Sequence, residues 1–201
     1  MNSLVKPINF LLDILDRLKS FNFLGAVALR IYLSPIFILA GWHKLQDLDA
    51  TAYYFGEFLG LPAPMLMATL AGLTEFIGGI ALLLGLGLRL FALPLMVTMV
   101  VAATTAHWEN GWHALPETQL TVPWEWRTDL IEEAQTRKDA AKSLLKNHGN
   151  YSWLTETGSI TILKNGIEFA ATYFIMLLVL FFMGAGNYLS LDYWIAKRYR
   201  K

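Results

Sequence analysis

Four ionisable side chains lie within or at the ends of long apolar runs of the sequence: His43, Glu75, His107 and Glu168. A charge in hydrocarbon costs about 2.5–3.5 kcal/mol on insertion scales, so an acid in such a run must be protonated, paired or hydrogen-bonded. Two histidines and two carboxylates could form a proton relay, a pocket for a quinone headgroup or a site for a hard metal ion. We therefore expect these four side chains to converge, with Glu75 facing the interior of a helical bundle, and they are the catalytic candidates.

Cofactor binding has an overlapping set of candidates, which are Arg30, Trp42, His43 and Lys44. The candidates for a metal ion are His43, His107 and Glu168, but no HxxxH or ExxH spacing supports a metal site, so none is predicted. The sequence also has no Walker A motif, no complete dinucleotide-binding glycine motif and no G-x-S-x-G element. No complete catalytic constellation is therefore recognisable.

The composition is that of an integral membrane protein. Of the 201 residues, 55% are hydrophobic and 16% are charged, whereas soluble domains carry about 25% charged residues. The net charge is zero, with Lys and Arg clustered at the termini, which argues against a nucleic-acid surface. Cysteine is absent, so this chain can form no disulfide and no thiolate-based cofactor or metal site.

Four apolar segments are long enough to cross a hydrocarbon core about 30 Å thick. The predicted helices cover residues 24–45, 64–86, 90–107 and 164–183. The turn between the second and third is short, which makes these two helices antiparallel neighbours. The expected fold class is all-α, a four-helix transmembrane bundle with an extended extracytoplasmic loop that contains an amphipathic helix.

Two segments outside the predicted spans have helical periodicity. In residues 1–23 charges alternate with leucines at helical spacing, which predicts an amphipathic helix that lies on the membrane surface or packs on the bundle. Residues 24–201 then form the membrane domain, with an insert at 108–164 that is rich in tryptophan, a residue favoured at the membrane interface. The periodicity of residues 128–148 predicts a helix that rests on the membrane or caps the bundle and ends at Gly149. Its expected apolar face is Leu130, Ile131, Ala134, Ala141, Leu144 and Leu145.

Basic residues favour one topology. They lie in the N-terminal segment, in the turn after the second helix and in the C-terminal tail. The long loop has basic residues as well, but acids outnumber them there. This distribution predicts cytoplasmic termini and an outer long loop. His43, Lys44, His107 and Glu168 then lie at the outer ends of the helices, with Glu75 below them. Arg30 lies in the inner half, where it would snorkel to headgroups or pair towards Glu75.

Several strings together resemble the DoxX family of small four-helix membrane proteins. The matching positions are Arg30, the segment 40–44 (AGWHK), the segment 72–79 (GLTEFIGG), Arg89 and the segment 184–192 (GAGNYLSLD). The long loop departs from a minimal member of the family. Its strings 107–112 (HWENGW) and 149–156 (GNYSWLTE), with 165–173 (NGIEFAATY), are similar to the HvfX-type branch, whose members are encoded with copper-binding, ribosomally made peptides and their maturation enzymes.

The resemblance implies a multi-pass protein of the bacterial cytoplasmic membrane with redox associations and, for the HvfX-type branch, a link to copper homeostasis. One interpretation is an accessory protein that binds a protein or modified-peptide partner through its outer loop. The alternative is a quinone-interacting subunit, similar to the small subunit of a thiosulfate:quinone oxidoreductase, with quinone as cofactor. A small transporter is a third interpretation, for which four helices leave little room unless the chain forms a homo-oligomer.

Overall fold

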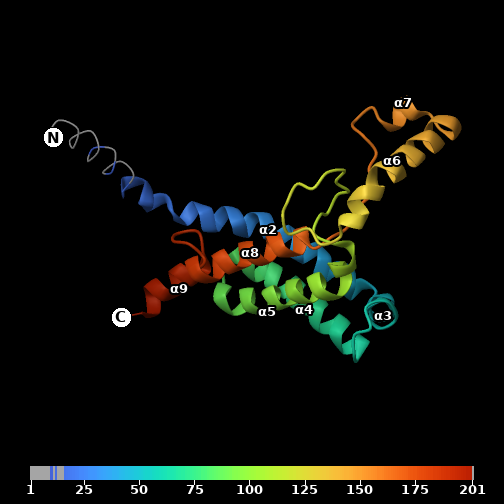
Figure 1. The fold of residues 1–201 in the computed structure, drawn as a ribbon. Coiled ribbons are helices and arrows are strands. Elements are labelled where there is room, and N and C mark those ends of the chain that lie inside the picture. Colours follow the sequence, from blue (N-terminus) through green and yellow to red (C-terminus); the bar gives the residue numbers. More distant parts are fainter. Residues whose placement is uncertain (1–9, 11, 13–15, 201) are drawn as a thin grey trace. The chain divides into compact units, whose positions relative to one another are not determined.

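The computed structural model describes residues 10, 12 and 16–200, and all regular elements in this part of the chain are helical (Figure 1). The all-α prediction is therefore confirmed there. Most of the predicted N-terminal amphipathic segment, 1–23, lies outside the described residues. The chain divides into two compact units: a core unit, Met1–Thr98 with Phe174–Lys201, and a loop unit, Met99–Tyr173.

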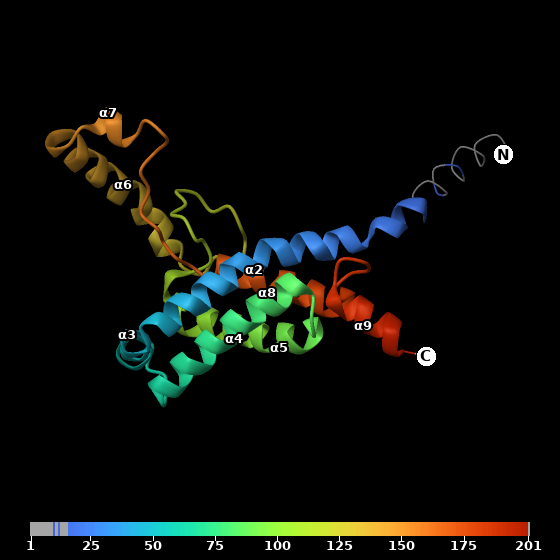
Figure 2. The ribbon, with the colours of Figure 1, turned by 180° about the vertical axis from the view of Figure 1, so that it is seen from behind.

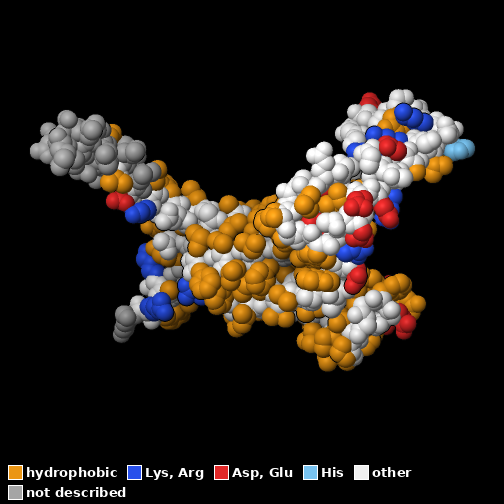
Figure 3. All heavy atoms as spheres, viewed as in Figure 1, with side chains coloured by type: hydrophobic (Ala, Val, Ile, Leu, Met, Phe, Trp, Pro, Cys, Tyr) orange, Lys and Arg blue, Asp and Glu red, His pale blue; other side chains and the backbone are white. Residues whose placement is uncertain are grey.

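Three helical segments of the described chain are long and apolar enough to cross a membrane: Asp16–Gln46, Pro64–Leu84 and Leu88–Asn110. They contain, in order, helix α2 (Phe23–Gln46), helix α4 (Pro64–Leu84) and helix α5 (Leu88–Val101). The segment predicted as a fourth span is helix α8 (Glu168–Met183), which is apolar but has only 16 residues. Side chains such as Leu90, Val97 and Phe182 are well exposed on α5 and α8, and Figure 3 shows the hydrophobic surface that results.

Helices α2 and α4 lie side by side in the core unit and pack through glycines (Figures 1 and 2). A Cβ added at Gly41 would lie 2.7 Å from the carbonyl oxygen of Gly72, and one added at Gly79 would lie 2.8 Å from the backbone nitrogen of Ile38. Such separations are too short for a real Cβ. The two backbones therefore approach closely because these positions lack side chains, as small residues allow between membrane helices.

The end of α4 and the start of α5 are held by the C-terminal part of the core unit. Gly85 ends α4 in the left-handed conformation (φ +64°) and its N–H donates to Leu82. Asp192 then accepts the N–H groups of Gly87 and Leu88 at 2.7 and 3.1 Å. This carboxylate satisfies donors at the start of α5, where negative charge is favourable.

Several short elements were not predicted from the sequence. Helix α3 (Leu48–Tyr53) and the π-helical turn η2 (Tyr54–Phe58) lie in the connection between α2 and α4, and the Asp47 side chain caps α3 by accepting the N–H of Ala50 at 2.9 Å. Helix α9 (Leu191–Tyr199) follows Ser190, which caps it through the N–H of Tyr193. After α5 the chain continues through a π-helical turn, η3 (Ala102–His107), and a 3₁₀ turn, η4 (Trp108–Asn110).

In the loop unit, helix α6 (Thr128–His148) has the predicted bounds and is followed by the single turn α7 (Tyr151–Leu154). Gly149 ends α6 by donating its N–H to Leu145, in an extended conformation. The expected apolar face is only partly correct, because Leu144 is 62% exposed. Lys138 and Lys142 are instead half-buried along with Ala141 and Leu145.

Two backbone segments close the base of the loop unit. Gly166 donates to His113, Ile167 to Gly111 and Glu168 to Trp112, at 2.9–3.1 Å. This close approach requires a glycine at position 166, because a Cβ there would lie 2.5 Å from the carbonyl oxygen of His113. The start and end of the long insert are thereby joined directly.

Candidate functional site

A buried ion pair joins α2 and α4 in the core unit. Lys44 Nζ donates to Glu75 Oε2 at 2.5 Å, across 31 residues of sequence. Glu75 is 5% exposed, and the Lys44 side chain is 26% exposed. Glu75 therefore faces the interior and is paired, as predicted.

Local packing explains how the pair forms. Glu75 lies on the buried face of α4 with Gly72 and Gly79. Gly72 lets this end of α2 pack closely, since a Cβ there would lie 2.9 Å from Leu45 Cδ2, next to Lys44. Beside the pair in the sequence, Trp42 and Phe76 pack with ring centroids 5.8 Å apart. An ammonium has three donors, so Lys44 can bind a ligand oxygen while it contacts Glu75. The pair can thus hold a polar headgroup and exchange a proton with it.

Arg30 is not a partner of Glu75, so the predicted pairing towards Glu75 is wrong. Its guanidinium donates at 2.7–2.9 Å to four backbone carbonyls, those of Leu82, Leu83, Ala185 and Leu189. Arg30 is 3% exposed, so it does not snorkel to headgroups either. A guanidinium can serve several carbonyls because it has five donors in a fixed plane. Its role is to fasten the end of α4 to the segment between α8 and α9.

The two residues that precede Lys44 are exposed. His43 is exposed and forms no hydrogen bond or ion pair with a described residue, and Trp42 is 46% exposed. Their predicted part in cofactor binding stays a prediction. Lys44 is the one residue of the segment 42–44 that packs against Glu75.

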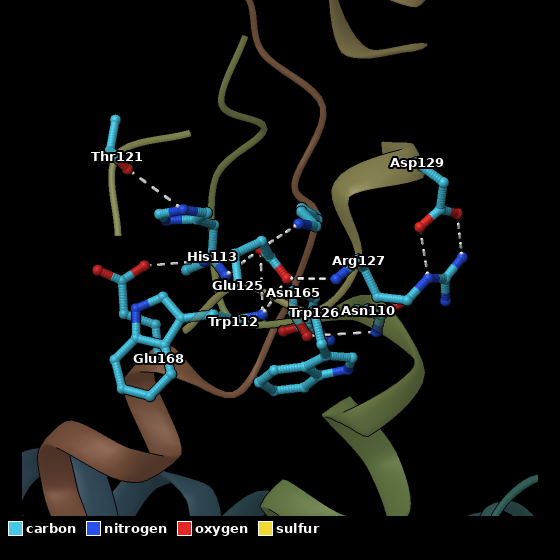
Figure 4. A network of polar contacts seen from close by, with 12 residues as sticks. Asn110, Trp112, His113, Thr121, Glu125, Trp126, Arg127, Asp129, Asn165 and Glu168 are labelled. Carbon is cyan, nitrogen blue, oxygen red and sulfur yellow. Dashed lines mark hydrogen bonds and ion pairs between the residues drawn. The ribbon is translucent and has the colours of Figure 1, made fainter. Parts of the chain in front are cut away.

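His107 and Glu168, the other two predicted site residues, belong to the loop unit and hold its base. His107 Nδ1 lies 2.9 Å from the Asn165 carbonyl oxygen, which requires the tautomer with a proton on Nδ1. Glu168, the first residue of α8, accepts the N–H of Ala114 at 2.9 Å. Figure 4 shows Glu168 and Asn165 in this network. Since the four predicted side chains are divided between two units, their convergence stays a prediction.

The most buried carboxylate of the loop unit, Glu125, was missed from the sequence. It accepts the N–H groups of Trp112 and Arg127 at 3.1 and 2.9 Å and the Lys164 ammonium at 2.8 Å (Figure 4). Burial raises its pKa, but the hydrogen bonds from Lys164, Arg127 and Trp112 outweigh that effect and lower the pKa to about 2. The only signal in the sequence was an acid between two tryptophans, Trp124 and Trp126.

The outer part of this network is held by exposed charges. Arg127 binds Asp129 through two hydrogen bonds, at 2.7 and 2.9 Å, and this contact lowers the pKa of Asp129. His113 Nε2 lies 3.3 Å from the Thr121 hydroxyl. Among residues 10, 12 and 16–200, no three metal-ligating side chains gather into a cluster. Within this network Glu125, Glu168 and His107 bind backbone groups and so hold the backbone in position.

Comparison with known proteins gives two partial matches. The DoxX family model matches residues 25–108, a region that contains Arg30, Lys44 and Glu75. A Bacillus subtilis (strain 168) protein named "Putative oxidoreductase CatD" is 33% identical over 87 residues, which are 43% of this chain and 62% of that protein. The chain thus spans less than two thirds of the length of this relative. No solved structure matches the chain.

Proposed function

We propose that this chain, which carries a DoxX family domain over residues 25–108, is an integral membrane accessory protein. It would support a membrane-associated redox system, or the maturation and export of a metal-binding peptide in bacteria. The basic residues at its two ends favour a multi-pass topology in the cytoplasmic membrane with both termini inside and the loop unit outside. Helix α8, at about 24 Å, would complete a four-helix bundle where the bilayer thins around it.

The observation that carries this proposal is how the loop unit uses its polar and its aromatic side chains. Glu125, Glu168 and His107 all bind backbone groups or Lys164 inside the unit. Large aromatic side chains remain exposed instead, with Trp124 at 56% and Trp153 at 68%. Tryptophan is enriched where proteins bind one another. The unit thus resembles a rigid binding platform more than a catalytic centre.

A partner on this platform can be captured directly. A photo-cross-linking amino acid at Trp153 or Trp124, in the full-length protein in its native membranes, should give one discrete adduct for the partner protein or peptide. Tyr199, which is 74% exposed on α9, provides the control position. Adducts at all three positions, or at none, would argue against a platform. An adduct of twice the chain mass would identify the partner as a second copy.

A second function is favoured by the Lys44–Glu75 pair together with the oxidoreductase name of the Bacillus subtilis relative. In this alternative the chain is a quinone-interacting subunit of a membrane oxidoreductase complex. Lys44 would hold a quinone oxygen, Glu75 would carry the proton and a partner would supply the electrons.

The alternative predicts quinone in the purified protein and loss of quinone reduction in Glu75→Gln membranes. Glu57→Gln is the matched control, because Glu57 is an exposed acid in η2. If no quinone co-purifies and Glu75→Gln membranes reduce quinone normally, the quinone function is wrong and the accessory function stands alone.

A further inference from the structure

The loop unit contains a cavity of about 270 Å³ that none of the functions above uses. One wall is a face of α6, and the other is the chain returning from α7, residues 160–164. Figures 1 and 2 both show this return segment running beside α6. We call this cavity the α6 groove.

All charged side chains that line the α6 groove are basic: Arg137, Lys138, Lys142 and Lys164. Two of these are neutralised, since Arg137 pairs with Glu133 and Lys164 with Glu125. Lys138 and Lys142 form no hydrogen bond or ion pair with any described residue, although both are half-buried. The groove therefore holds two uncompensated positive charges.

These lysines occupy positions where a helix normally places apolar residues. Lys138 follows the buried Ala134 by one turn, and Lys142 follows Lys138 by another, on the side that also carries Leu145. Like charges four residues apart repel each other on a helix, and partial burial strengthens the repulsion. No acidic side chain lines the groove to offset this cost, and Asp139, one turn before Lys142, is exposed and accepts a hydrogen bond from Gln135. A bound anion would offset it.

Apart from Asn110, Thr118 and Thr161, the rest of the lining is apolar, which restricts the kind of anion. Leu130 and Leu145 on α6 face Ile162 and Leu163 of the return segment, whose side chains are 59% and 58% exposed. A small hydrophilic anion would leave these surfaces in contact with water. An anion attached to a hydrocarbon chain would cover them.

The position of the α6 groove along the chain indicates where such a ligand comes from. Asn110 lines the groove and is also the last residue of the candidate membrane span Leu88–Asn110. Nearby, Trp108 and Trp126 stack with ring centroids 4.6 Å apart, and tryptophan is typical of the headgroup level of a bilayer. The groove thus begins where the candidate span ends, a position that insertion of this span would put at the level of lipid phosphates.

We propose that the α6 groove binds the phosphate headgroup of an anionic phospholipid. Lys138 and Lys142 contact the phosphate, and Leu145 and Ile162 contact the first methylenes of the acyl chains. This binding would fasten α6 to the membrane surface. The proposal concerns the groove only and does not depend on the partner platform.

The test is lipid binding by the delipidated full-length protein, measured by native mass spectrometry with phosphatidylglycerol and with phosphatidylcholine. The wild type should prefer phosphatidylglycerol. Lys142→Gln should weaken phosphatidylglycerol binding about fivefold, because one lysine near an anionic surface contributes about that factor, and the double variant Lys138→Gln/Lys142→Gln should abolish the preference. Lys146→Gln removes the same charge one turn further along α6, outside the groove, and should leave binding within about twofold.

Four results would overturn the proposal. The first is equal binding of the two lipids by the wild type. The second is an equal loss in Lys146→Gln and Lys142→Gln, which would indicate a diffuse charge effect. The third is inorganic phosphate alone shielding Lys138 and Lys142 from chemical modification as well as the lipid does. If Lys142→Gln binds lipid normally but loses a partner adduct, the groove is a protein-docking site and the lipid assignment is wrong. Circular dichroism of each variant checks that α6 still forms.

Discussion

Lys44 Nζ lies 2.5 Å from Glu75 Oε2, and this contact joins helices α2 and α4 of the core unit. The partners differ in their access to water, because the Glu75 side chain is 6% exposed and that of Lys44 is 26% exposed. A buried ion that loses its partner is destabilising by about 3–5 kcal/mol, whereas a well-packed apolar pair can replace both partners at little cost.

The pair should therefore respond unequally to substitution. Lys44→Met leaves a carboxylate in the interior and should lower the midpoint of thermal unfolding in detergent more than Glu75→Gln, which leaves a lysine that can reach water. The double variant Lys44→Met/Glu75→Leu should recover most of the stability. Equal midpoints for the two single variants would contradict the asymmetry in exposure.

Arg30 should not be replaceable by lysine. Its four carbonyl partners need a planar group with several donors, and Arg30→Lys would leave buried carbonyls unpaired at a cost on the order of 3 kcal/mol. Arg89→Lys is the control, because Arg89 also donates to backbone carbonyls, those of Phe181 and Phe182, but is exposed. Chemical denaturation of both variants measures the difference. A similar loss of unfolding free energy in Arg30→Lys and Arg89→Lys would mean that the burial of Arg30 is unimportant.

Two glycines of α2 should behave in opposite ways when changed to alanine. A Cβ at Gly41 would lie 2.7 Å from the Gly72 oxygen, whereas one at Gly25 would have no neighbour within 4 Å. Gly41→Ala should destabilise the α2–α4 contact by about 1–3 kcal/mol, while Gly25→Ala should be neutral or slightly stabilising, since alanine favours helix. Thermal unfolding of the two variants in the same detergent provides the comparison.

The loop unit should lose stability in acid because of Glu125. Its pKa is lowered to about 2 in the folded protein, so its contribution is fully present above the ordinary glutamate pKa and is lost as the pH falls towards 2. A shift of that size corresponds to about 3 kcal/mol. Tryptophan fluorescence of the full-length protein between about pH 6 and pH 2 should report the loss.

Glu125→Gln should weaken the loop unit at neutral pH, because it leaves Lys164, with an 8% exposed side chain, without its carboxylate. Its difference from the wild type should shrink as the pH falls and the wild-type carboxyl becomes protonated. Glu132→Gln, an exposed acid on α6, is the matched control and should follow the wild type throughout. A constant difference at every pH would show that the charge of Glu125 is not the cause.

The sequence by itself determined the features that depend on local composition and period. Apolar length predicted α2, α4 and the start of α5 to within two residues, although α5 ends at Val101 and the predicted helix ran to 107. Periodicity predicted the bounds of α6, and the absence of cysteine excluded thiol chemistry. Glu75 could be expected to be buried and paired, because an unpaired charge in the middle of an apolar helix would be costly in a membrane. These properties depend on residues that are close together in the sequence, so they can be predicted without knowledge of the tertiary structure.

The tertiary structure decided which groups meet. Glu75 meets Lys44 rather than Arg30, because the rotation and depth of α4 against α2 are set by where glycines let the backbones approach. Arg30 donates hydrogen bonds to carbonyl oxygens of residues up to 159 positions away in the sequence. Glu125 is buried because the two ends of a long insert join around it. Such meetings depend on packing between distant segments, and no local pattern encodes them.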